Sequence, residues 1–541
     1  MDQTTGKFAY SLCEFTSQAP VRLRHLDPQK AINWAAHPIS AVLQRGRHRS
    51  FELQISAAGE WLVESSSGVT QFPERFLLEH PGTIAQLRQS EYRVLPVKEE
   101  MRKNLVRKIK SNEQLFPGII GYDASVIPQL ENAILSGQDI VFLGERGQAK
   151  SRLIRSLVNM LDEQVPIIDG CEINDNPYAP ICRACRDRVA KDGDRVQVRW
   201  ITPDERYSEK LATPDTSIAD LIGEVDPIRI AEGKYLADEL TIHFGLVPRT
   251  NRGIFAINEL PDLAERIQVG LLNLIEERDV QIRGFKLRLP IDVYVVASAN
   301  PEDYTNRGRI ITPLKDRFGA QIRTHYPRTV EDEIRIVDQE RTDFQDRDLQ
   351  VFMPDFMKEI VAEITQLARR SPKINQRSGV SVRISISNYE NLASNASRRA
   401  LRTGETEAVP RISDLPSVIP SSAGKLEMET WEEGDDQTVL EKIIKTAVLN
   451  VFRRHFEANQ FSELVQRFDA GLTFEVSEGQ PADRYAAQLR ELPGMEKALK
   501  SLGLEKRPAL AASGVEFVLE GLHLSKRINK TELDGASIYA G

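Results

Sequence analysis

The sequence predicts an α/β core in which a parallel sheet is covered by helices on both faces, followed by a helical region. Between about residues 96 and 330, short apolar runs alternate with helical patterns, and one run leads directly into a glycine-containing loop and a helix. The runs are apolar throughout, which is typical of strands that are buried on both faces. The clearest three are Asp139–Leu143, Gly253–Ile257 and Asp292–Ala297.

Four regions are predicted along the chain. Residues 1–95 form an N-terminal accessory region of α+β type, because Ser50–Ile55 and Glu60–Val63 have strand-like alternation. Residues 96–330 form the α/β core, and residues 331–410 form a helical lid. Residues 411–541 contain a linker and a mostly helical C-terminal region; the linker is marked by Pro410, Pro416, Pro420 and Gly424.

Composition narrows the class of protein. With 71 basic and 79 acidic residues, the net charge of -8 argues against direct nucleic-acid binding, which needs local positive charge. No stretch approaches the roughly 20 apolar residues of a membrane span. The N-terminus lacks the pattern of a secretory signal, and four cysteines do not make a disulfide framework. We therefore expect a cytoplasmic protein.

The strongest motif is a phosphate-binding loop. It follows the apolar run Asp139–Leu143 and precedes a helix, which is the context that such a loop requires. Its glycines let backbone N–H groups face phosphate oxygens, and the helix N-terminus adds positive charge. Lys150 is expected to reach the β- and γ-phosphates of ATP, and the Ser151 hydroxyl to ligate Mg²⁺. The loop is Gly144, Glu145, Arg146, Gly147, Gln148, Ala149, Lys150 and Ser151.

Ala149 departs from the glycine that usually precedes the lysine. We expect Ala to be tolerated there, because the α-helical backbone is predicted to begin at this residue.

Two further strand ends carry polar residues. Asn258 and Glu259 follow a buried strand, where Glu259 is predicted to act as the base that polarises water. Asn258 stands where an aspartate would face the Mg²⁺ shell, and offers a neutral amide oxygen. Asn300 ends the next buried strand and is predicted to position the water near the γ-phosphate.

Two arginines are predicted to contact nucleotide from elsewhere. Arg317, in Pro313–Gly319, is placed to reach the γ-phosphate of a neighbouring subunit and to stabilise transition-state charge. The alternative is a surface salt bridge with Asp316 or another acid. Arg383 begins a helical run in the lid region and is expected to contact bound nucleotide.

With these motifs in order, residues from about 114 to 400 resemble AAA+ ATPases of the clade that contains magnesium chelatase I-type subunits and MoxR-type proteins. Leu115–Gly121 looks like that family's entry into the domain, and Leu246–Gly253 is similar to the segment before its acidic strand. Ser298–Glu302 and Leu314–Gly319 match its sensor and arginine-finger signature. The near-alternating Arg278–Leu289 stands where the clade inserts a hairpin, with the turn at Gly284.

The resemblance implies an ATP-driven remodelling motor that assembles as a homo-oligomer, a hexameric ring, and works with a separate metal-ion-binding adhesion-type partner protein. A nucleotide-regulated scaffold with negligible hydrolysis is the alternative, because Ala149 and Asn258 depart from the family pattern. A transcriptional activator of sigma-54 type is disfavoured, because the contact loop of that class and a C-terminal helix-turn-helix are not recognisable.

Three cysteines have part of a zinc-site pattern. Cys182 and Cys185 have the spacing of a metal knuckle, and Cys171 precedes them. A structural zinc site needs four ligands, and no fourth cysteine or close histidine occurs in this stretch. We therefore expect uncommitted thiols rather than structural Zn²⁺, with completion by a neighbouring subunit's loop as the alternative.

Overall fold

The structure is a computed structural model. It describes residues 41–45, 49–55, 61–65, 68–71, 80–226, 239–281, 288–300, 309–342, 349–376, 378–429, 435–477, 479–533 and 536–541. The chain divides into two compact units, Met1–Gly82 and Thr83–Gly541, which are described separately. Within the described ranges, no helix is long and apolar enough to cross a membrane.

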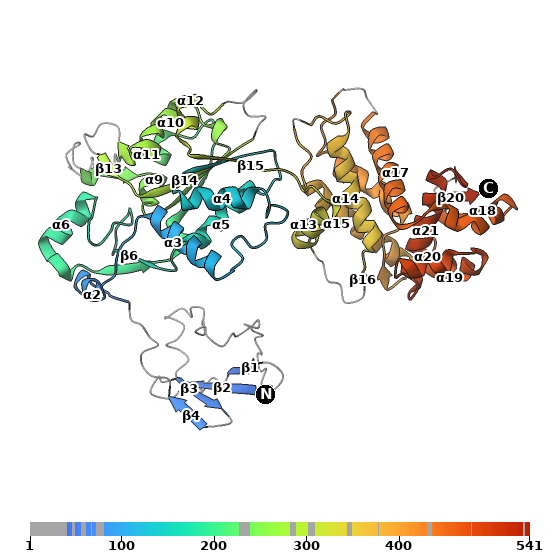
Figure 1. Ribbon diagram of the computed structural model, residues 1–541, viewed down its shortest axis with the longest axis horizontal. Helices are drawn as coiled ribbons and strands as arrows, with labels where there is room; N and C mark the ends of the chain where they lie inside the picture. Colours follow the sequence, from blue (N-terminus) through green and yellow to red (C-terminus); the bar gives the residue numbers. More distant parts are fainter. Residues whose placement is uncertain are drawn as a thin grey trace, which may run out of the picture. The chain divides into compact units, whose positions relative to one another are not determined.

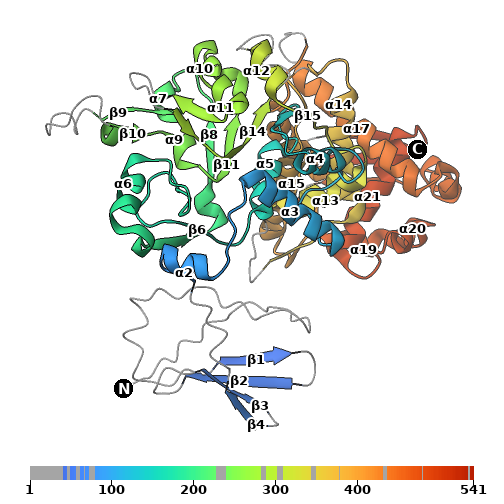
Figure 2. The same cartoon turned by 60° about the vertical axis from the view of Figure 1, so that its left-hand side comes forward.

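The first unit contains one antiparallel sheet, whose strands are paired in sequence order. Figure 2 shows its four strands. They are β1 (Ala41–Arg45), β2 (Arg49–Ile55), β3 (Trp61–Ser65) and β4 (Gly68–Gln71). The two runs that predicted strands in this region correspond to β2 and β3, as their alternation indicated.

The second unit is built on a five-stranded parallel sheet (Figure 1). Its order is β15-β5-β14-β11-β8, so the strand before the phosphate loop lies between two strands that come much later in the chain. The strands are β5 (Ile140–Leu143), β8 (Tyr207–Leu211), β11 (Gly253–Asn258), β14 (Val293–Ala299) and β15 (Ala320–Arg323). The three predicted strands are β5, β11 and β14. The prediction of an α/β fold with a parallel sheet is confirmed.

Alternate residues of the strands face two different cores. On β5, Ile140 and Phe142 pack into one hydrophobic cluster with α3, α4 and α5, whereas Val141 packs into the other with α10, α11 and α12. Strands covered on both faces must be apolar at every position, which explains why these three runs were recognisable. The helices are α3 (Val97–Lys110), α4 (Val126–Leu135), α5 (Lys150–Ser156), α10 (Glu265–Gly270), α11 (Leu272–Glu276) and α12 (Thr312–Arg317).

Several small elements are inserted between the strands of the sheet. The excursion between α5 and β8 pairs β6 with β7 and carries α6 between them. The predicted hairpin is present as the antiparallel pair β12 and β13, while its predicted turn at Gly284 lies outside the described residues. The elements are α2 (Ile84–Gln89), β6 (Val165–Ile168), α6 (Arg183–Asp192), β7 (Val198–Ile201), α7 (Ile218–Leu221), β9 (Gly223–Val225), β10 (Ile242–Phe244), α9 (Leu246–Arg249), β12 (Asp279–Gln281) and β13 (Arg288–Pro290).

Beyond the sheet, the chain is mainly helical, and helices from the predicted lid and from the C-terminal region share one hydrophobic core. Phe356 of α14 stacks on Phe517 of α21, with ring centroids 4.3 Å apart. The last two strands of the chain, β19 and β20, form a three-stranded sheet with β18. The elements are α13 (Val330–Glu340), β16 (Gln350–Val351), α14 (Asp355–Arg370), α15 (Arg383–Thr403), β17 (Glu407–Ala408), α17 (Asp435–His455), α18 (Ser462–Asp469), β18 (Phe474–Ser477), α19 (Ala482–Gln488), α20 (Met495–Ser501), α21 (Pro508–Leu524), β19 (Asn529–Leu533) and β20 (Ala536–Ala540).

The segment with several prolines, which the sequence predicted as a linker, is packed against the helical region. It forms a 3-10 helix over Ile412–Val418 and the helix α16 (Ile419–Ala423). Asp414 is fully buried and accepts hydrogen bonds from Arg399 and from the backbone N–H of Arg411. Pro420 lies in the first turn of α16, where proline is compatible with a helix, so a turn signal in the sequence does not by itself predict an exposed segment. The domain boundaries stay a prediction.

Candidate nucleotide site

The phosphate loop connects β5 to α5 and needs glycine at two positions. A Cβ atom at Gly144 would lie 2.0 Å from Thr324 Oγ1, and one at Gly147 would lie 1.9 Å from Ser381 Oγ. Gly147 also has a φ of +74°, in the left-handed region that favours glycine. The loop is therefore folded tightly against its neighbours, as a cradle of backbone N–H groups requires.

Ala149 does not have the helical backbone that the sequence predicted. It is the N-cap of α5, and its φ of 56° and ψ of 18° place it in the left-handed region. In this region the Cβ of an L-residue approaches the following carbonyl, which costs roughly 1–2 kcal/mol. The prediction that a helical backbone begins at Ala149 is wrong, and the structure explains why glycine suits this position.

Lys150 lies inside the loop, with only 7% of its surface exposed. Its Nζ donates to the backbone oxygens of Gly144 and Glu145, the latter at 2.8 Å, and to Asn300 Oδ1 at 2.6 Å. Asn300 Nδ2 in turn donates to Glu259 Oε2 at 2.5 Å. Three residues that the sequence singled out from three motifs thus form one chain of hydrogen bonds.

The position of this chain follows from the sheet. Strands β5, β14 and β11 are neighbours and parallel, so their carboxyl ends meet at one edge. In open α/β sheets, ligands bind at this edge, where the strand order reverses. A buried cation beside tightly packed glycines fits the phosphates of a nucleotide.

Glu259 has an unusual backbone as well. Its φ of 54° lies in the left-handed region, and its N–H donates to Ser298 Oγ at 3.2 Å. A strained residue that the surrounding structure holds in place is typical of functional sites. In this conformation the Glu259 carboxylate accepts the hydrogen bond from Asn300.

Asn258 binds a carboxylate that the sequence analysis missed. Its Nδ2 donates to Glu209 Oε1, while its Oδ1 accepts from Ser298 Oγ at 3.2 Å. Glu209 comes from the neighbouring strand β8, which lies at the edge of the sheet beside β11 (Figure 2). A negative charge therefore stands next to the amide that occupies the expected aspartate position.

Glu209 is held in its charged form. Arg155 Nε donates to Glu209 Oε2 at 2.8 Å, and the Tyr207 hydroxyl donates to the same oxygen at 2.9 Å. Partial burial acts to raise the pKa of the Glu209 carboxyl, but the hydrogen bonds from Arg155 and Tyr207 outweigh it and hold this pKa below its usual value. Arg155 lies on α5, one turn after Ser151, so Glu209 faces the helix that begins in the phosphate loop.

The other loop residues keep the loop in shape. The Gln148 side chain accepts from the Thr324 hydroxyl at 2.7 Å and donates to Glu145 at 3.4 Å. The carbonyl of Arg146 accepts from the Tyr326 hydroxyl at 2.9 Å. Ser151 is exposed in the first turn of α5, so its hydroxyl can reach a ligand at the loop.

Arg317 and Arg383, the two predicted nucleotide contacts outside the loop, do not belong to the chain of hydrogen bonds from Lys150 to Glu259. Arg317 ends α12, where its Nε donates to Glu276 at 2.6 Å and its guanidinium also donates to the Pro313 carbonyl. It remains 29% exposed. Arg383 is exposed at the start of α15, two residues after the Ser381 side chain that lies against Gly147. The start of α15 is therefore near the loop.

The parallel sheet, the tightly folded glycine loop and the three joined strand ends form the arrangement of a P-loop nucleotide-binding fold. No family model matches the chain. It is 27% identical over 247 residues to a magnesium-chelatase subunit ChlI-2 from Arabidopsis thaliana, spanning 43% of this chain and 55% of that relative. It is 24% identical over 369 residues to the ChlI subunit of Synechocystis sp., spanning 64% of this chain and 98% of that protein.

These relatives confirm the resemblance of the chain to magnesium-chelatase I-type subunits. A solved structure of the complex between BchI and BchD of magnesium chelatase matches with 19% identity and a TM-score of 0.31, covering 62% of this chain and 94% of that chain. The MoxR-type part of the resemblance has no support among these relatives and stays a prediction.

Proposed function

We propose that this chain binds and hydrolyses ATP and uses the cycle to remodel a partner protein. The observation that carries the proposal is the hydrogen-bonded chain from Lys150 through Asn300 to Glu259. It places a cation for the phosphates, an amide that can orient water and a carboxylate that can accept a proton within one site.

The roles of the residues follow from this arrangement. Lys150 compensates the negative charge of the β- and γ-phosphates, and the loop backbone holds them in place. Glu259 accepts the proton of the attacking water, and Asn300 keeps the Glu259 carboxylate and that water in line. A base and its orienting partner must lie within hydrogen-bonding distance, which this pair satisfies.

We assign the binding of Mg²⁺ to the Ser151 hydroxyl and to the hydrogen-bonded pair of Asn258 and Glu209. Magnesium keeps several waters when it is bound, so charge outside its direct ligands matters. Asn258 alone provides a dipole, but Glu209 adds a full negative charge through the hydrogen bond between them. The pair therefore replaces the single aspartate that the family pattern would place here.

We further propose that the chain acts in a homo-oligomeric, hexameric ring, with Arg317 contributing to the site of the neighbouring subunit. The end of α12 presents the Arg317 guanidinium on an exposed helix end, paired with Glu276. Exposed pairs of this kind are weak, so Arg317 can exchange Glu276 for a phosphate at small cost. A metal-ion-binding adhesion-type partner stays a prediction from the resemblance; the BchI of the similar solved structure is bound to BchD.

A nucleotide-regulated scaffold with negligible hydrolysis is the second candidate. Two observations favour it: Asn258 replaces the usual acid, and Ala149 strains the loop. Such a protein would bind ATP through Lys150 but leave Glu259 without a catalytic role.

Turnover of the wild type against Glu259→Gln, at saturating Mg²⁺–ATP, tests the two candidates. A motor loses nearly all turnover in Glu259→Gln while it still binds ATP, and the exposed variant Glu496→Gln serves as the control. If wild type and Glu259→Gln hydrolyse ATP equally slowly, with the partner present and absent, the motor proposal fails and the scaffold takes its place.

A further inference from the structure

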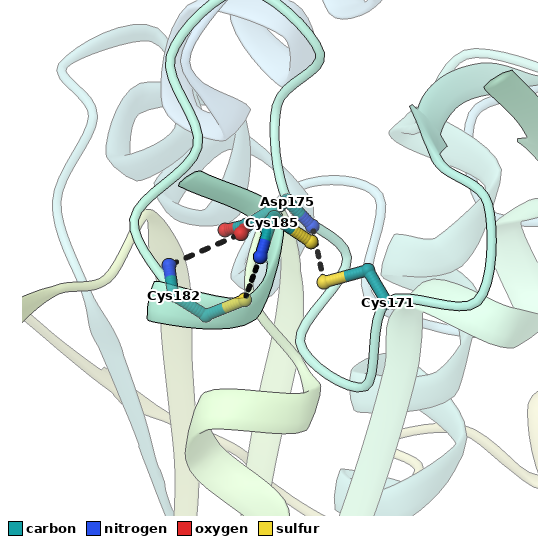
Figure 3. A group of neighbouring side chains, drawn as sticks. All are labelled: Cys171, Asp175, Cys182 and Cys185. Carbon is teal, nitrogen blue, oxygen red and sulfur yellow. Dashed lines mark hydrogen bonds between the residues drawn. The ribbon is translucent and has the colours of Figure 1, made fainter. Parts of the chain in front are cut away.

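Three cysteines and one aspartate converge in the excursion between α5 and β8. Figure 3 shows Cys171 and Asp175 from the loop after β6, with Cys182 and Cys185 from the first turn of α6. One potential ligand atom from each of the four residues lies within 4.8 Å of all the others. The sequence prediction found three of these ligands and missed Asp175, because it sought a cysteine or a histidine as the fourth.

We propose that these four residues form a structural Zn²⁺ site with Cys171, Asp175, Cys182 and Cys185 as ligands. Zinc binds thiolate sulfur at about 2.3 Å and carboxylate oxygen at slightly shorter distances, in a tetrahedron whose edges are about 3.8 Å. Ligand atoms already within 4.8 Å of one another need only small side-chain movements to reach that geometry. Four ligands from the protein make a closed site, which is typical of structural zinc.

Backbone N–H groups donate to two of the three sulfurs. The N–H groups of Ile173 and Asp175 both donate to Cys171 Sγ at 3.4 Å, and the N–H of Cys185 donates to Cys182 Sγ at 3.3 Å. These donors stabilise negative charge on sulfur and fix its direction, as the outer partners of metal ligands do.

Arg188 supplies the remaining partner. Its guanidinium donates to Cys185 Sγ at 3.2 Å and to the Asp169 carbonyl at 2.6 Å. The cation is therefore held against the cluster from the same helix, α6. It offsets part of the negative charge that three thiolates and one carboxylate would bring to a divalent ion.

The aspartate is oriented for the same centre. Asp175 is fully buried, and its two carboxylate oxygens accept the N–H groups of Ile181 and Cys182, each at 3.1 Å. Burying a charged carboxylate among thiols is costly unless a nearby positive charge compensates it. A divalent cation provides that charge, and the two N–H bonds fix the carboxylate as expected for a ligand.

The local fold gives this site a structural purpose. Between β6 and α6 the chain has little regular structure, although Ile173 of this segment packs into the hydrophobic cluster of the parallel sheet. A metal that links Cys171 and Asp175 to the start of α6 would cross-link this irregular segment. A cavity of about 100 Å³, lined in part by Cys171 and Cys182, lies beside the cluster.

Metal analysis of the purified full-length protein tests the proposal. After expression with added zinc and removal of loose metal by gel filtration, wild type should carry one Zn²⁺ per chain. The matched control Cys13→Ser removes the remaining cysteine of the sequence, which is not among the proposed ligands, and should keep that zinc. Cys185→Ser should lose it, and Asp175→Asn should bind zinc about 10- to 100-fold more weakly in a competition with a chromophoric chelator.

Cobalt gives a second readout, and its measurement on wild type does not depend on how well the variants fold. Wild-type protein loaded with Co²⁺ should show thiolate-to-metal charge transfer and the intense d–d bands of tetrahedral coordination. Wild type that takes up neither zinc nor cobalt, or that is isolated with a Cys182–Cys185 disulfide, would overturn the proposal. Unchanged zinc affinity and an unchanged cobalt spectrum in Asp175→Asn would equally overturn the four-ligand assignment.

Discussion

The side-chain amide of Asn258 donates a hydrogen bond to the carboxylate of Glu209, across the neighbouring strands β11 and β8. The residue that a P-loop ATPase would have as an acid is thus neutral here, and an acid from the next strand lies against it. The negative charge of the site is retained, but it comes from Glu209 on β8 instead of from residue 258. This relationship predicts a specific pattern of mutational effects.

Glu209→Gln should leave ATP binding intact. It should raise the Mg²⁺ concentration needed for half-maximal turnover about 10- to 100-fold, because it removes the negative charge outside the direct ligands of the ion. The measurement is steady-state turnover against Mg²⁺ concentration at fixed ATP. Lys210→Gln, the next residue on β8, is the control and should behave as wild type. Unchanged Mg²⁺ dependence in Glu209→Gln would show that Glu209 serves only to pair with Arg155.

Asn258→Asp should be harmful alone and tolerated together with Glu209→Gln. Alone, it places two carboxylates in contact, so that one of them must stay protonated or move away. The double variant restores one carboxylate and one amide with their positions exchanged. We expect turnover of the double variant to exceed that of either single variant, as a double-mutant cycle would measure. Additive losses would mean that Asn258 and Glu209 act independently.

Much of this site was predictable from the sequence, and the missing part has a physical reason. Strands β5, β11 and β14 are buried on both faces, so they are apolar at every position and their ends were easy to find. Strand β8 lies at the edge of the sheet and reads Tyr-Ser-Glu-Lys-Leu, with mixed polarity that predicts no strand. Glu209 was missed with the strand that carries it.

The strain at Ala149 was also beyond the sequence. Ala is a strong helix former, and its place directly before a helix favoured a helical backbone there. The left-handed conformation arises because the loop must turn before Lys150 to direct N–H groups inward, which is a demand of the whole loop. Asp175 is a comparable case, since an aspartate is recognised as a metal ligand only once its neighbours in space are known.

Ala149→Gly should stabilise the protein. Glycine adopts the left-handed region without steric cost, so the variant should gain about 1 kcal/mol, less a part lost to the greater freedom of the unfolded chain. Thermal unfolding without nucleotide measures the effect. Ala393→Gly, in the middle of α15, is the control and should lose stability. A lower unfolding temperature for Ala149→Gly would mean that the loop does not impose the left-handed backbone at this residue.

Lys150→Ala should abolish ATP binding in practice. Lys150 is buried among the oxygens of Gly144, Glu145 and Asn300, where its charge is poorly screened. Loss of charge-assisted bonds to two phosphates should weaken affinity roughly 100-fold. Equilibrium titration with a fluorescent ATP analogue measures this, and the exposed variant Lys497→Ala is the control. Equal affinity of Lys150→Ala and wild type would mean that nucleotide binds elsewhere.

Arg317→Ala should retain ATP binding and lose turnover by about 1000-fold, because the guanidinium stabilises charge that develops only in the transition state. Its pairing with Glu276 on an exposed helix end contributes little to stability, so the variant should fold normally. Arg317→Lys keeps the charge but loses the planar fork, and should restore only part of the rate.

The assignment of Arg317 to a neighbouring subunit is tested by mixing two inactive variants. Arg317→Ala subunits have an intact Glu259, and Glu259→Gln subunits have an intact Arg317. In a mixed ring, some interfaces join the intact Glu259 of one subunit to the intact Arg317 of the next, and turnover should reappear there. The recovered rate should rise with the fraction of mixed interfaces and be greatest near an equal ratio. Mixed rings that assemble normally and recover no turnover would place Arg317 outside the neighbour's site and leave its bond to Glu276 as its role.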